Sequence, residues 1–312
     1  MRCPQPGQSP ALVRKLVQNA VAKVRAIIGP QNIPDSEPLA QSALNKLHQG
    51  EKPTAEELAA LEIVVRLLRP VVFSRNGALD DLPDSAGHNL YPAELKDLWS
   101  GFRDRIKRVV PSIGRIDTKE RKHIGTGFLV ADGLLATNRH VLGAMTFGSE
   151  VLAPKSARVG LKWETGSANT PADDVAIEGV AAIHPKLDMV LLTVPKLGRP
   201  AVEMEPVPVT ESTRVATIGY PGEDPVNNPL FLAGVFQGKF GLRRAAVGEV
   251  LDGTESPALF HDCSTTQGNS GSPVFSLASG KVAGIHRVGF FMYRNEAVDA
   301  KELQKFVQDA TA

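Results

Sequence analysis

From Ile124 to the end of the chain, short apolar runs alternate with turns that contain Gly, Pro or Asp. The clearest turn is Asp132-Gly133, between two apolar runs in IGTGFLVADGLLATNRHV. Asp-Gly in this setting is a strong β-hairpin signal because it tolerates positive φ. Further strand candidates follow at the spacing of a barrel or sandwich: Val175–Ile183, Met189–Thr193, Arg214–Gly219, Leu230–Phe240, Ala258–Cys263, Ser272–Ser276 and Val282–Arg287. This part of the chain is therefore predicted to be mainly β.

The N-terminal part, residues 1–73, has a different pattern, with apolar residues every three or four positions. This periodicity predicts amphipathic helices over Ala11–Ile28 and Glu37–Gln49. A third helix is predicted to start at Thr54, which forms a capping box with Glu57. We therefore expect a small all-α domain over residues 1–73.

Residues 74–91 are polar and rich in turn-forming residues, so we expect an exposed linker there. The second domain is predicted over residues 92–312. It begins with a helix over Pro92–Lys107 and ends with a helix that a second capping box, Asp299 with Glu302, introduces.

Charge and composition restrict the partners of the protein. The 312 residues contain 35 Lys and Arg against 34 Asp and Glu, so no overall field attracts nucleic acid or an anionic membrane. No stretch approaches 18 apolar residues, and no apolar core of a signal peptide is found near the start. Two cysteines, Cys3 and Cys263, are too few for a disulfide framework. We expect a soluble, cytoplasmic protein without membrane or nucleic-acid partners.

The segment TTQGNSGSPVF is the first candidate for chemistry, because glycines flank Ser270. Gly268 and Gly271 allow the backbone to bend so that the hydroxyl is exposed and neighbouring N–H groups point at one spot. Such a spot binds an oxyanion. Taken alone, a turn of this kind is more often only a turn, so a nucleophile here needs a base.

A base and an orienting acid are both available. His140 follows the second strand of the Asp132-Gly133 hairpin, although a histidine on an apolar strand is more often a hydrogen-bonded core residue. Asp188 precedes the apolar run MVLL, where a carboxylate is costly unless it is hydrogen-bonded. Asp173 and Asp174 are rival acids, but their polar loop favours two solvated turn residues. A neutral imidazole that takes a proton from serine requires such an acid to fix its tautomer.

The order His140, Asp188, Ser270, with the motifs GTGFLV, TNRHV, DMVLL and GNSGSPVF, resembles the trypsin-like serine proteases from about Gly125 to the C-terminus. The resemblance implies a chymotrypsin-like fold of two six-stranded antiparallel barrels with the triad at their junction. It also implies an oxyanion hole made by the backbone N–H groups of Gly268 and Ser270. We expect a serine endopeptidase that cleaves proteins or peptides through an acyl-enzyme.

The string CSTTQGNSGSPVF followed by GIHRVGF resembles the bacterial glutamyl endopeptidases. In that family a threonine and a histidine line the primary pocket, which implies that Thr265 and His286 bind substrate here, with neighbouring Ser264. A hydroxyl and an imidazole hydrogen-bond a carboxylate, so we expect cleavage after Glu or Asp. The alternative is that His286 only packs in its strand, and Arg287 either assists acid binding or points away.

One residue departs from the secreted digestive proteases. Asn269 stands where those enzymes have an aspartate that pairs with a newly cut N-terminus. Because Asn cannot form that ion pair, we do not expect activation by cleavage before Ile124.

Other patterns give weaker signals. GVFQGKF lacks the spacing of a phosphate-binding loop, and His261, Asp262 and Cys263 are neighbours on one strand that cannot all face one metal ion. The basic cluster around Arg103 and Arg105 is most simply a solvated helix face. We therefore expect neither a metal nor a cofactor.

Two alternatives to a peptidase use the same residues. One is a catalytically silent binding or scaffold protein with a protease fold, and the other is an esterase. The helical region 1–73 resembles the adaptor of cytoplasmic bacterial proteases, some linked to defence or regulated proteolysis. It is expected to bury its apolar faces on the protease or on a regulatory protein partner.

Overall fold

The computed structural model describes residues 36–57, 60–61, 69, 71–82, 93–225, 232, 235–251, 253–289 and 294–312. Contacts divide the chain into two compact units. The smaller takes its described residues from Met1–Pro70, Leu82–Lys96 and Pro225–Lys239, and the larger from Val71–Asp81, Asp97–Asp224 and Phe240–Ala312. The helix predicted over Ala11–Ile28 lies outside the described residues, as does most of the helix predicted from Thr54.

The smaller unit contains helix α2, Ser36–Gln49, which confirms the second predicted helix. The capping box that follows is also confirmed. The Glu57 N–H donates to Thr54 Oγ1 (3.2 Å), and the Thr54 N–H donates to Glu57 Oε2 (2.7 Å). Ser42 and Lys46 of α2 donate to the same carboxylate at 2.6 and 2.9 Å, so Glu57 ties α2 to the helical turn after it.

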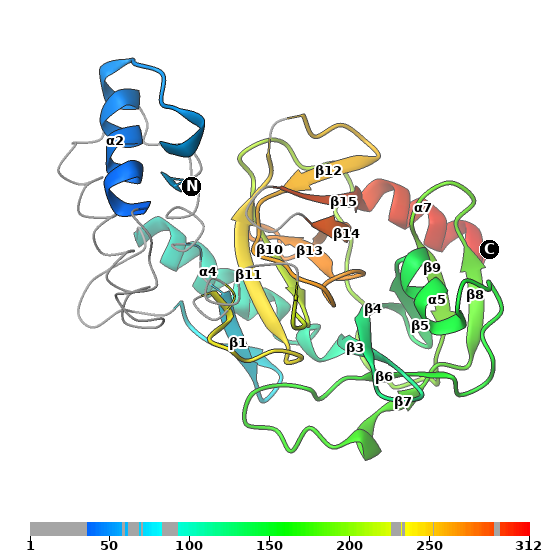
Figure 1. Ribbon diagram of the computed structural model, residues 1–312. Helices are drawn as coiled ribbons and strands as arrows, with labels where there is room; N and C mark the ends of the chain where they lie inside the picture. The colour runs from blue at the N-terminus through cyan, green and yellow to red at the C-terminus, as the bar shows by residue number, and fades with distance from the viewer. Residues whose placement is uncertain are drawn as a thin grey trace. The chain divides into compact units, whose positions relative to one another are not determined.

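The larger unit contains two antiparallel sheets (Figure 1). The first has the order β7-β6-β3-β4-β5-β9-β8. Its strands are β3 (Ile113–Thr118), β4 (His123–Ala131), β5 (Leu134–Thr137), β6 (Ala157–Gly160), β7 (Val175–Ala176), β8 (Gly179–Ile183) and β9 (Val190–Thr193). The predicted hairpin is confirmed, since Ala131 pairs with Leu134 and Gly133 has a φ of +85°.

The second sheet has the order β12-β15-β14-β13-β10-β11-β1-β2. Its strands are β1 (Val71–Arg75), β2 (Ala78–Leu79), β10 (Arg214–Gly219), β11 (Arg244–Glu249), β12 (Ala258–His261), β13 (Pro273–Ser276), β14 (Val282–Gly289) and β15 (Asn295–Asp299). Apolar side chains of β10, β13 and β14 are buried, among them Val215, Phe275 and Ile285.

Helices accompany the sheets: α4 (Ala93–Ile106), α5 (Arg139–Thr146), α7 (Ala300–Thr311) and the 3₁₀ turns η2 (Val110–Ser112) and η3 (Pro171–Asp173). Helix α5 packs on β4. Helix α7 follows β15 directly and packs on β14 and β15. The N-cap half of its predicted capping box is confirmed, because the Asp299 side chain accepts from the Glu302 N–H at 3.0 Å. The other half is not formed, because the Asp299 N–H donates to the Pro257 carbonyl at 2.9 Å.

The predicted fold class, mainly β with two antiparallel barrels and a C-terminal helix, is confirmed, the barrels being two curled antiparallel sheets. The strand numbers differ from two sets of six. The first sheet has seven strands, including the two-residue β7, and the second has eight, because the hairpin β1–β2 joins it through β11.

Two boundary predictions are wrong. The linker predicted from residue 74 begins too early, because Ser74 lies in β1 and is fully buried. The strand predicted over Leu230–Phe240 is also wrong where the structure describes it, since residues 235–236 are helical. The actual strand is β11, which starts at Arg244 directly after Arg243, and both arginines are buried.

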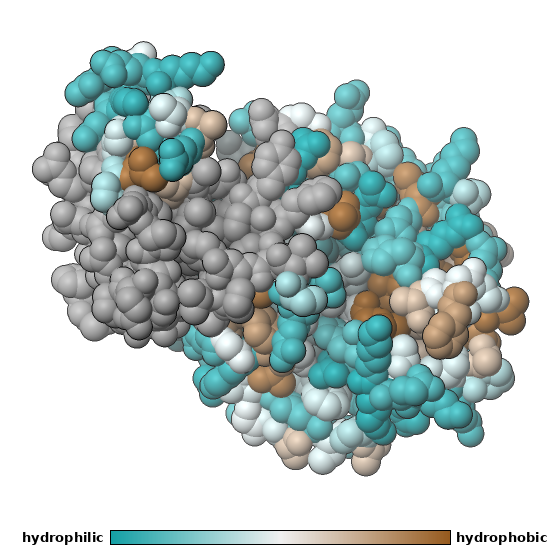
Figure 2. Space-filling model, in the orientation of Figure 1, coloured by the Kyte–Doolittle hydropathy of each residue, from teal (hydrophilic) through white to brown (hydrophobic). Residues whose placement is uncertain are grey.

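The described surface is mostly hydrophilic in the view of Figure 2, with scattered apolar residues. Phe147 and Val151 are the most exposed large apolar side chains among the described residues. No helix within the described ranges is long and apolar enough to cross a membrane.

Candidate active site

His140 and Asp188 form a close pair in the first sheet. His140 lies in the first turn of α5, just after β5, and Asp188 lies in the turn before β9, the strand that pairs with β5. His140 Nδ1 is 2.7 Å from Asp188 Oδ2, and the His140 backbone N–H donates to Asp188 Oδ1 at 3.0 Å. Both carboxylate oxygens therefore hold one residue, which fixes the ring and its tautomer.

The Asp188 turn is itself anchored. Asn138, the N-cap residue of α5, donates from its side chain to the Asp188 carbonyl at 2.9 Å. Burial alone would raise the pKa of Asp188. The hydrogen bonds from the His140 ring and backbone, with the positive charges of His140 and Arg287, outweigh burial and hold this pKa below its usual value. Asp188 is therefore ionised near pH 7.

The two rival acids, Asp173 and Asp174, have contacts with residues other than His140. Asp174 is buried and accepts from the Trp163 indole N–H at 2.8 Å, so the prediction that it is a solvated turn residue is wrong. Asp173 is more exposed, and its Oδ1 lies 3.2 Å from Lys162 Nζ. Asp188 is the carboxylate that contacts His140.

Ser270 lies in a turn that leads into β13, in the second sheet. Glycines on either side have positive φ, +90° at Gly268 and +85° at Gly271. A Cβ at Gly268 would lie 2.4 Å from His123 Cε1, and a Cβ at Gly271 would lie 2.1 Å from the Thr126 carbonyl oxygen. Both positions therefore need glycine for conformation and for space.

The peptide between Gln267 and Gly268 has a defined direction. The Gln267 carbonyl accepts from the Gly222 N–H at 2.6 Å. In a planar trans peptide the N–H points away from the carbonyl, so the Gly268 N–H faces away from Gly222. Neither this N–H nor that of Ser270 is hydrogen-bonded to another described residue. Two free donors on one turn are what an oxyanion hole requires.

The turn brings Ser270 to the helix that carries His140. A Cβ at Gly125 would lie 2.9 Å from the Val141 methyl carbons and 3.1 Å from the Ser270 carbonyl oxygen. The residue after His140 and the Ser270 backbone therefore pack on the same glycine. The Ser270 hydroxyl donates to the Arg287 carbonyl at 3.4 Å, a long and weak hydrogen bond.

The predicted pocket residues lie beside this turn. The His286 carbonyl accepts from the Gly271 N–H, and the His286 N–H donates to the Ser272 carbonyl, both at 2.8 Å. Thr265 is buried, and its hydroxyl donates to Asn295 Oδ1 at 2.7 Å. Ser264 is 6% exposed beside it. The sequence therefore indicated residues that lie near Ser270, but it did not indicate Asn295.

A second histidine supports His286. His286 Nδ1 and His261 Nε2 are 3.2 Å apart, across the intervening strand β15. Burial holds the pKa of His286 well below its usual value, and the charges of His261 and His140 act in the same direction. His286 is therefore neutral near pH 7. No feature of the sequence paired His261 with His286, because only the strand order brings them together.

Arg287 and Asp262 have partners elsewhere. Arg287 Nε is 3.0 Å from Glu296 Oε1. Asp262 Oδ1 accepts from the Glu249 N–H at 2.8 Å. Among the residues that the structure describes, no group of three or more His, Cys, Asp or Glu side chains is arranged to hold a metal ion.

The chain was compared with known proteins. A family model described as a trypsin-like peptidase domain matches residues 125–285. None of the curated protein sequences compared with the chain matches it. Among solved structures, the Rv3671c protease in an inactive form is 18% identical, with a TM-score of 0.47 over 74% of this chain and 100% of that chain. A mutant of Rv3671c from M. tuberculosis, also in an inactive form, is 18% identical, with a TM-score of 0.46 over 66% of this chain and 90% of that chain. A serine endoprotease from Yersinia pestis is 16% identical, with a TM-score of 0.49 over 67% of this chain and 66% of that chain.

Proposed function

Since the chain belongs to the family of trypsin-like peptidase domains and is a serine endopeptidase, we propose that His140, Asp188 and Ser270 are its catalytic triad. The observation that carries this assignment is the double contact of Asp188 with the ring and backbone of His140. A half-buried carboxylate in this position holds Nδ1 protonated, so Nε2 is the free acceptor for the serine proton.

The reaction follows from these positions. The Ser270 hydroxyl leaves the Arg287 carbonyl, gives its proton to His140 Nε2, and its oxygen forms a bond to the scissile carbonyl carbon. The N–H groups of Gly268 and Ser270 bind the resulting oxyanion. His140 then protonates the departing amine as the C–N bond breaks, and water, activated by His140, hydrolyses the acyl-enzyme.

The test is digestion of a diverse peptide pool by the full chain, read by mass spectrometry. We expect cleavage that Ser270→Ala abolishes and that Ser272→Ala, altering a buried hydroxyl two positions on, leaves in place. Labelling by a fluorophosphonate is expected to follow the same pattern. Cleavage of simple esters without cleavage of peptides would indicate an esterase. A folded chain without labelling or turnover would be a silent scaffold, and the triad assignment would be wrong.

We also propose that the substrate residue before the scissile bond is Glu, or Asp. The support is a neutral, buried His286 whose Nδ1 is occupied by His261. If His261 Nε2–H donates to His286 Nδ1, then His286 carries its proton on Nε2 and offers it to a carboxylate. Thr265 would add a second donor by turning its hydroxyl from Asn295 to the substrate. Both donors replace water around the carboxylate.

Matched peptides that differ only in Glu or Gln before the cleaved bond test this specificity. We expect the Glu peptide to be preferred, and His286→Phe and His261→Phe to reduce the preference because each breaks the donor pair. Glu296→Gln, which alters the partner of Arg287, is the control and should retain the preference. Cleavage mainly after Lys, Arg or aromatic residues would exclude an acid-binding pocket.

We further propose that the N-terminal region 1–73 regulates the peptidase, in association with a protein partner. The last residues of this region, 71–73, already belong to β1, where the Ser74 hydroxyl donates to Glu164 at 2.7 Å. Arg243, fully buried, donates to Glu164 at 3.1 Å and to the Tyr220 hydroxyl at 3.0 Å. These polar contacts join β1 to the segment 220–222.

That segment adjoins the oxyanion hole. The Tyr220 carbonyl would lie 2.6 Å from a Cβ at Gly268, and Gly222 holds the Gln267 carbonyl. A displacement of β1 would therefore be transmitted through these hydrogen bonds to the Gly268 peptide, which is proposed to bind the oxyanion. Comparison of the full chain with a chain lacking residues 1–70, which keeps β1, tests the regulation. Unchanged peptidase activity together with unchanged partner association would show that the region is dispensable.

A further inference from the structure

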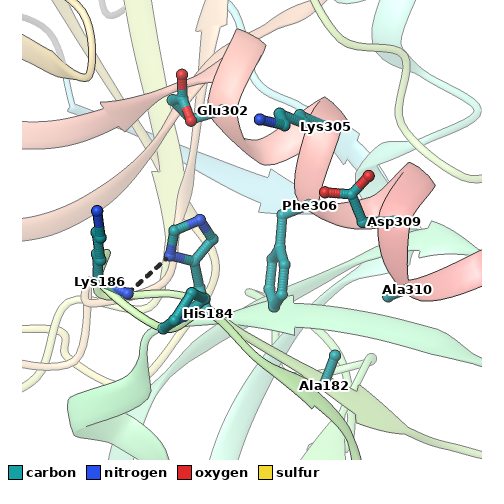
Figure 3. Close-up of a pocket in the computed structure, with 9 residues that line it drawn as sticks. Ala182, His184, Lys186, Glu302, Lys305, Phe306, Asp309 and Ala310 are labelled. Carbon is teal, nitrogen blue, oxygen red and sulfur yellow. Dashed lines mark hydrogen bonds between the residues drawn. The ribbon is translucent and has the colours of Figure 1, made fainter.

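His184 shapes the turn that presents Asp188. It follows β8, and its backbone N–H donates to the Met189 carbonyl at 3.0 Å. Its ring Nδ1 accepts two backbone N–H groups, from Lys186 at 3.2 Å and from Leu187 at 2.8 Å. The ring therefore closes the turn from inside, as an Asn side chain does in an Asx turn. Figure 3 shows the ring and its bond to the Lys186 N–H.

The residue after this turn is Asp188, whose carboxylate must meet both the ring and the backbone of His140. A small rotation of the turn would break at least one of the two hydrogen bonds between the Asp188 carboxylate and His140. From this geometry, and resting on the triad proposed above, we propose that His184 is a positioning residue for the peptidase reaction. It acts by fixing the direction in which Asp188 projects.

Helix α7 holds the ring in place. His184 packs edge-on against Phe306, with ring centroids 5.1 Å apart and planes at 76°. The two rings line a cavity of about 510 Å³ between the 184–186 segment and α7, which Glu302, Lys305 and Asp309 also line (Figure 3). The C-terminal helix, which is distant from β8 in the sequence, therefore supports the turn that carries Asp188.

Nδ1 accepts hydrogen bonds only from a ring that is unprotonated at this atom. Burial lowers the pKa of His184, and the charges of Lys305 and Lys186 lower it further, while Glu302 and Asp309 act in the opposite direction. The net pKa lies below the usual histidine value. The ring is therefore neutral near pH 7, so the turn stays closed.

Two substitutions of His184 separate the effect of its hydrogen-bond acceptor from the effect of its aromatic ring. His184→Asn keeps an acceptor oxygen on Cγ, where Nδ1 is attached, and removes the ring that packs on Phe306. His184→Phe keeps the ring and removes the acceptor. We expect His184→Phe to lower kcat/KM about tenfold with little change in KM, the size of a net loss of one to two hydrogen bonds. We expect His184→Asn to retain kcat/KM within about twofold but to unfold at a lower temperature.

The pH profile of kcat/KM supplies the readout that a purely structural role would not change. A displaced Asp188 stabilises the His140 imidazolium less, so the acid limb of the profile moves to lower pH. We expect this shift in His184→Phe and its absence in His184→Asn. Phe306→Leu, which keeps the acceptor, should lower stability and leave the acid limb in place.

Three outcomes would overturn the inference: an active His184→Phe chain with an unchanged acid limb, equal losses in both His184 variants, or the same shift in Phe306→Leu. If His184→Phe fails to fold, His184→Leu and the Asn variant provide the same comparison. Failure of the triad itself gives a different result, because the unsubstituted chain would then cleave peptides independently of Ser270 or would not cleave them at all.

Discussion

At the scale of single residues, glycine decides the shape of the turn that carries Ser270. Gly271 combines a positive φ with a neighbour that leaves no space for a side chain. The sequence indicated that Gly268 and Gly271 allow the backbone to bend. It did not indicate the neighbours, because Thr126 and His123 reach this turn from β4.

We expect Gly271→Ala to lower stability by more than the cost of its backbone angle. A non-glycine residue at positive φ costs about 1–2 kcal/mol, and the new methyl group also meets the Thr126 carbonyl oxygen. Gly166→Ala is the matched control, because Gly166 has a φ of +82° and nothing within 4 Å of an added Cβ. Urea unfolding of both variants gives the comparison. Equal losses would show that the contact with Thr126 does not constrain the turn.

The candidate residues were predictable from the sequence to different degrees. His140 and Ser270 stand beside local signals, a hairpin and a glycine turn, and Asp188 precedes a buried strand. His261, Asn295 and His184 have no such signal. Their roles depend on partners in other strands or in the backbone of a turn, and residue spacing does not encode those contacts.

At the scale of elements, two strands were not predicted from the sequence, β11 because it begins with charged residues and β1 because its partner strand lies far away in the sequence. Arg243 and Arg244 precede an apolar run, and such residues predict a surface loop, yet both side chains are buried. Arg243 is neutralised by Glu164, and Arg244 lies over the Phe73 ring at 3.5 Å. Burial lowers the pKa of Arg244 to about 9. Strand β1 was missed because its partner β11 follows about 170 residues later.

Breaking the Arg243–Glu164 pair should be costly. We expect Arg243→Met to destabilise the protein by about 3–5 kcal/mol, because it leaves a buried carboxylate without its cation. Adding Glu164→Gln should recover part of the loss, since the remaining amide is uncharged. Denaturant unfolding of the two single variants and the double variant forms the cycle. Additive losses would mean that the two side chains do not interact.

The smaller unit gives a prediction about pH. Hydrogen bonds from Ser42, Lys46 and the Thr54 backbone, opposed by burial and aided by the Lys46 charge, lower the pKa of Glu57 from 4.5 to about 2. A lowered pKa stabilises the folded form above about pH 4.5, and this stabilisation is lost as the pH falls from there through 2.

We expect the Thr54 amide, which donates to Glu57, to exchange faster over that pH window, beyond the change in intrinsic exchange. Glu57→Gln should remove this extra dependence. Glu51→Gln, at an exposed glutamate in the same unit, should keep it. An extra dependence that survives in Glu57→Gln would assign it to another group.

At the scale of the larger unit, Thr126 of β4, in the first sheet, binds the Ser270 turn of the second sheet. The Thr126 N–H donates to the Ser270 carbonyl at 2.8 Å. Its hydroxyl donates to the Gly268 carbonyl at 2.8 Å and accepts from the Tyr220 N–H at 3.2 Å. The sheet that holds His140 and Asp188 therefore sets the position of the turn that holds Ser270 and the proposed oxyanion donors.

Thr126→Val tests this connection, because valine has the same shape and lacks the hydroxyl. The Gly268 carbonyl and the Tyr220 N–H would lose their shared partner in a buried site, which costs about 1–3 kcal/mol. The Gly268 peptide also carries a proposed oxyanion donor, so we expect kcat to fall about tenfold or more while KM changes little. Thr126→Ser keeps the hydroxyl and should retain kcat within about threefold, losing only the packing of a methyl group. Peptide hydrolysis by the two variants, with their unfolding midpoints, separates the effects. If serine and valine lowered kcat equally, the methyl group would be what matters, and the hydroxyl would not connect the two sheets to catalysis.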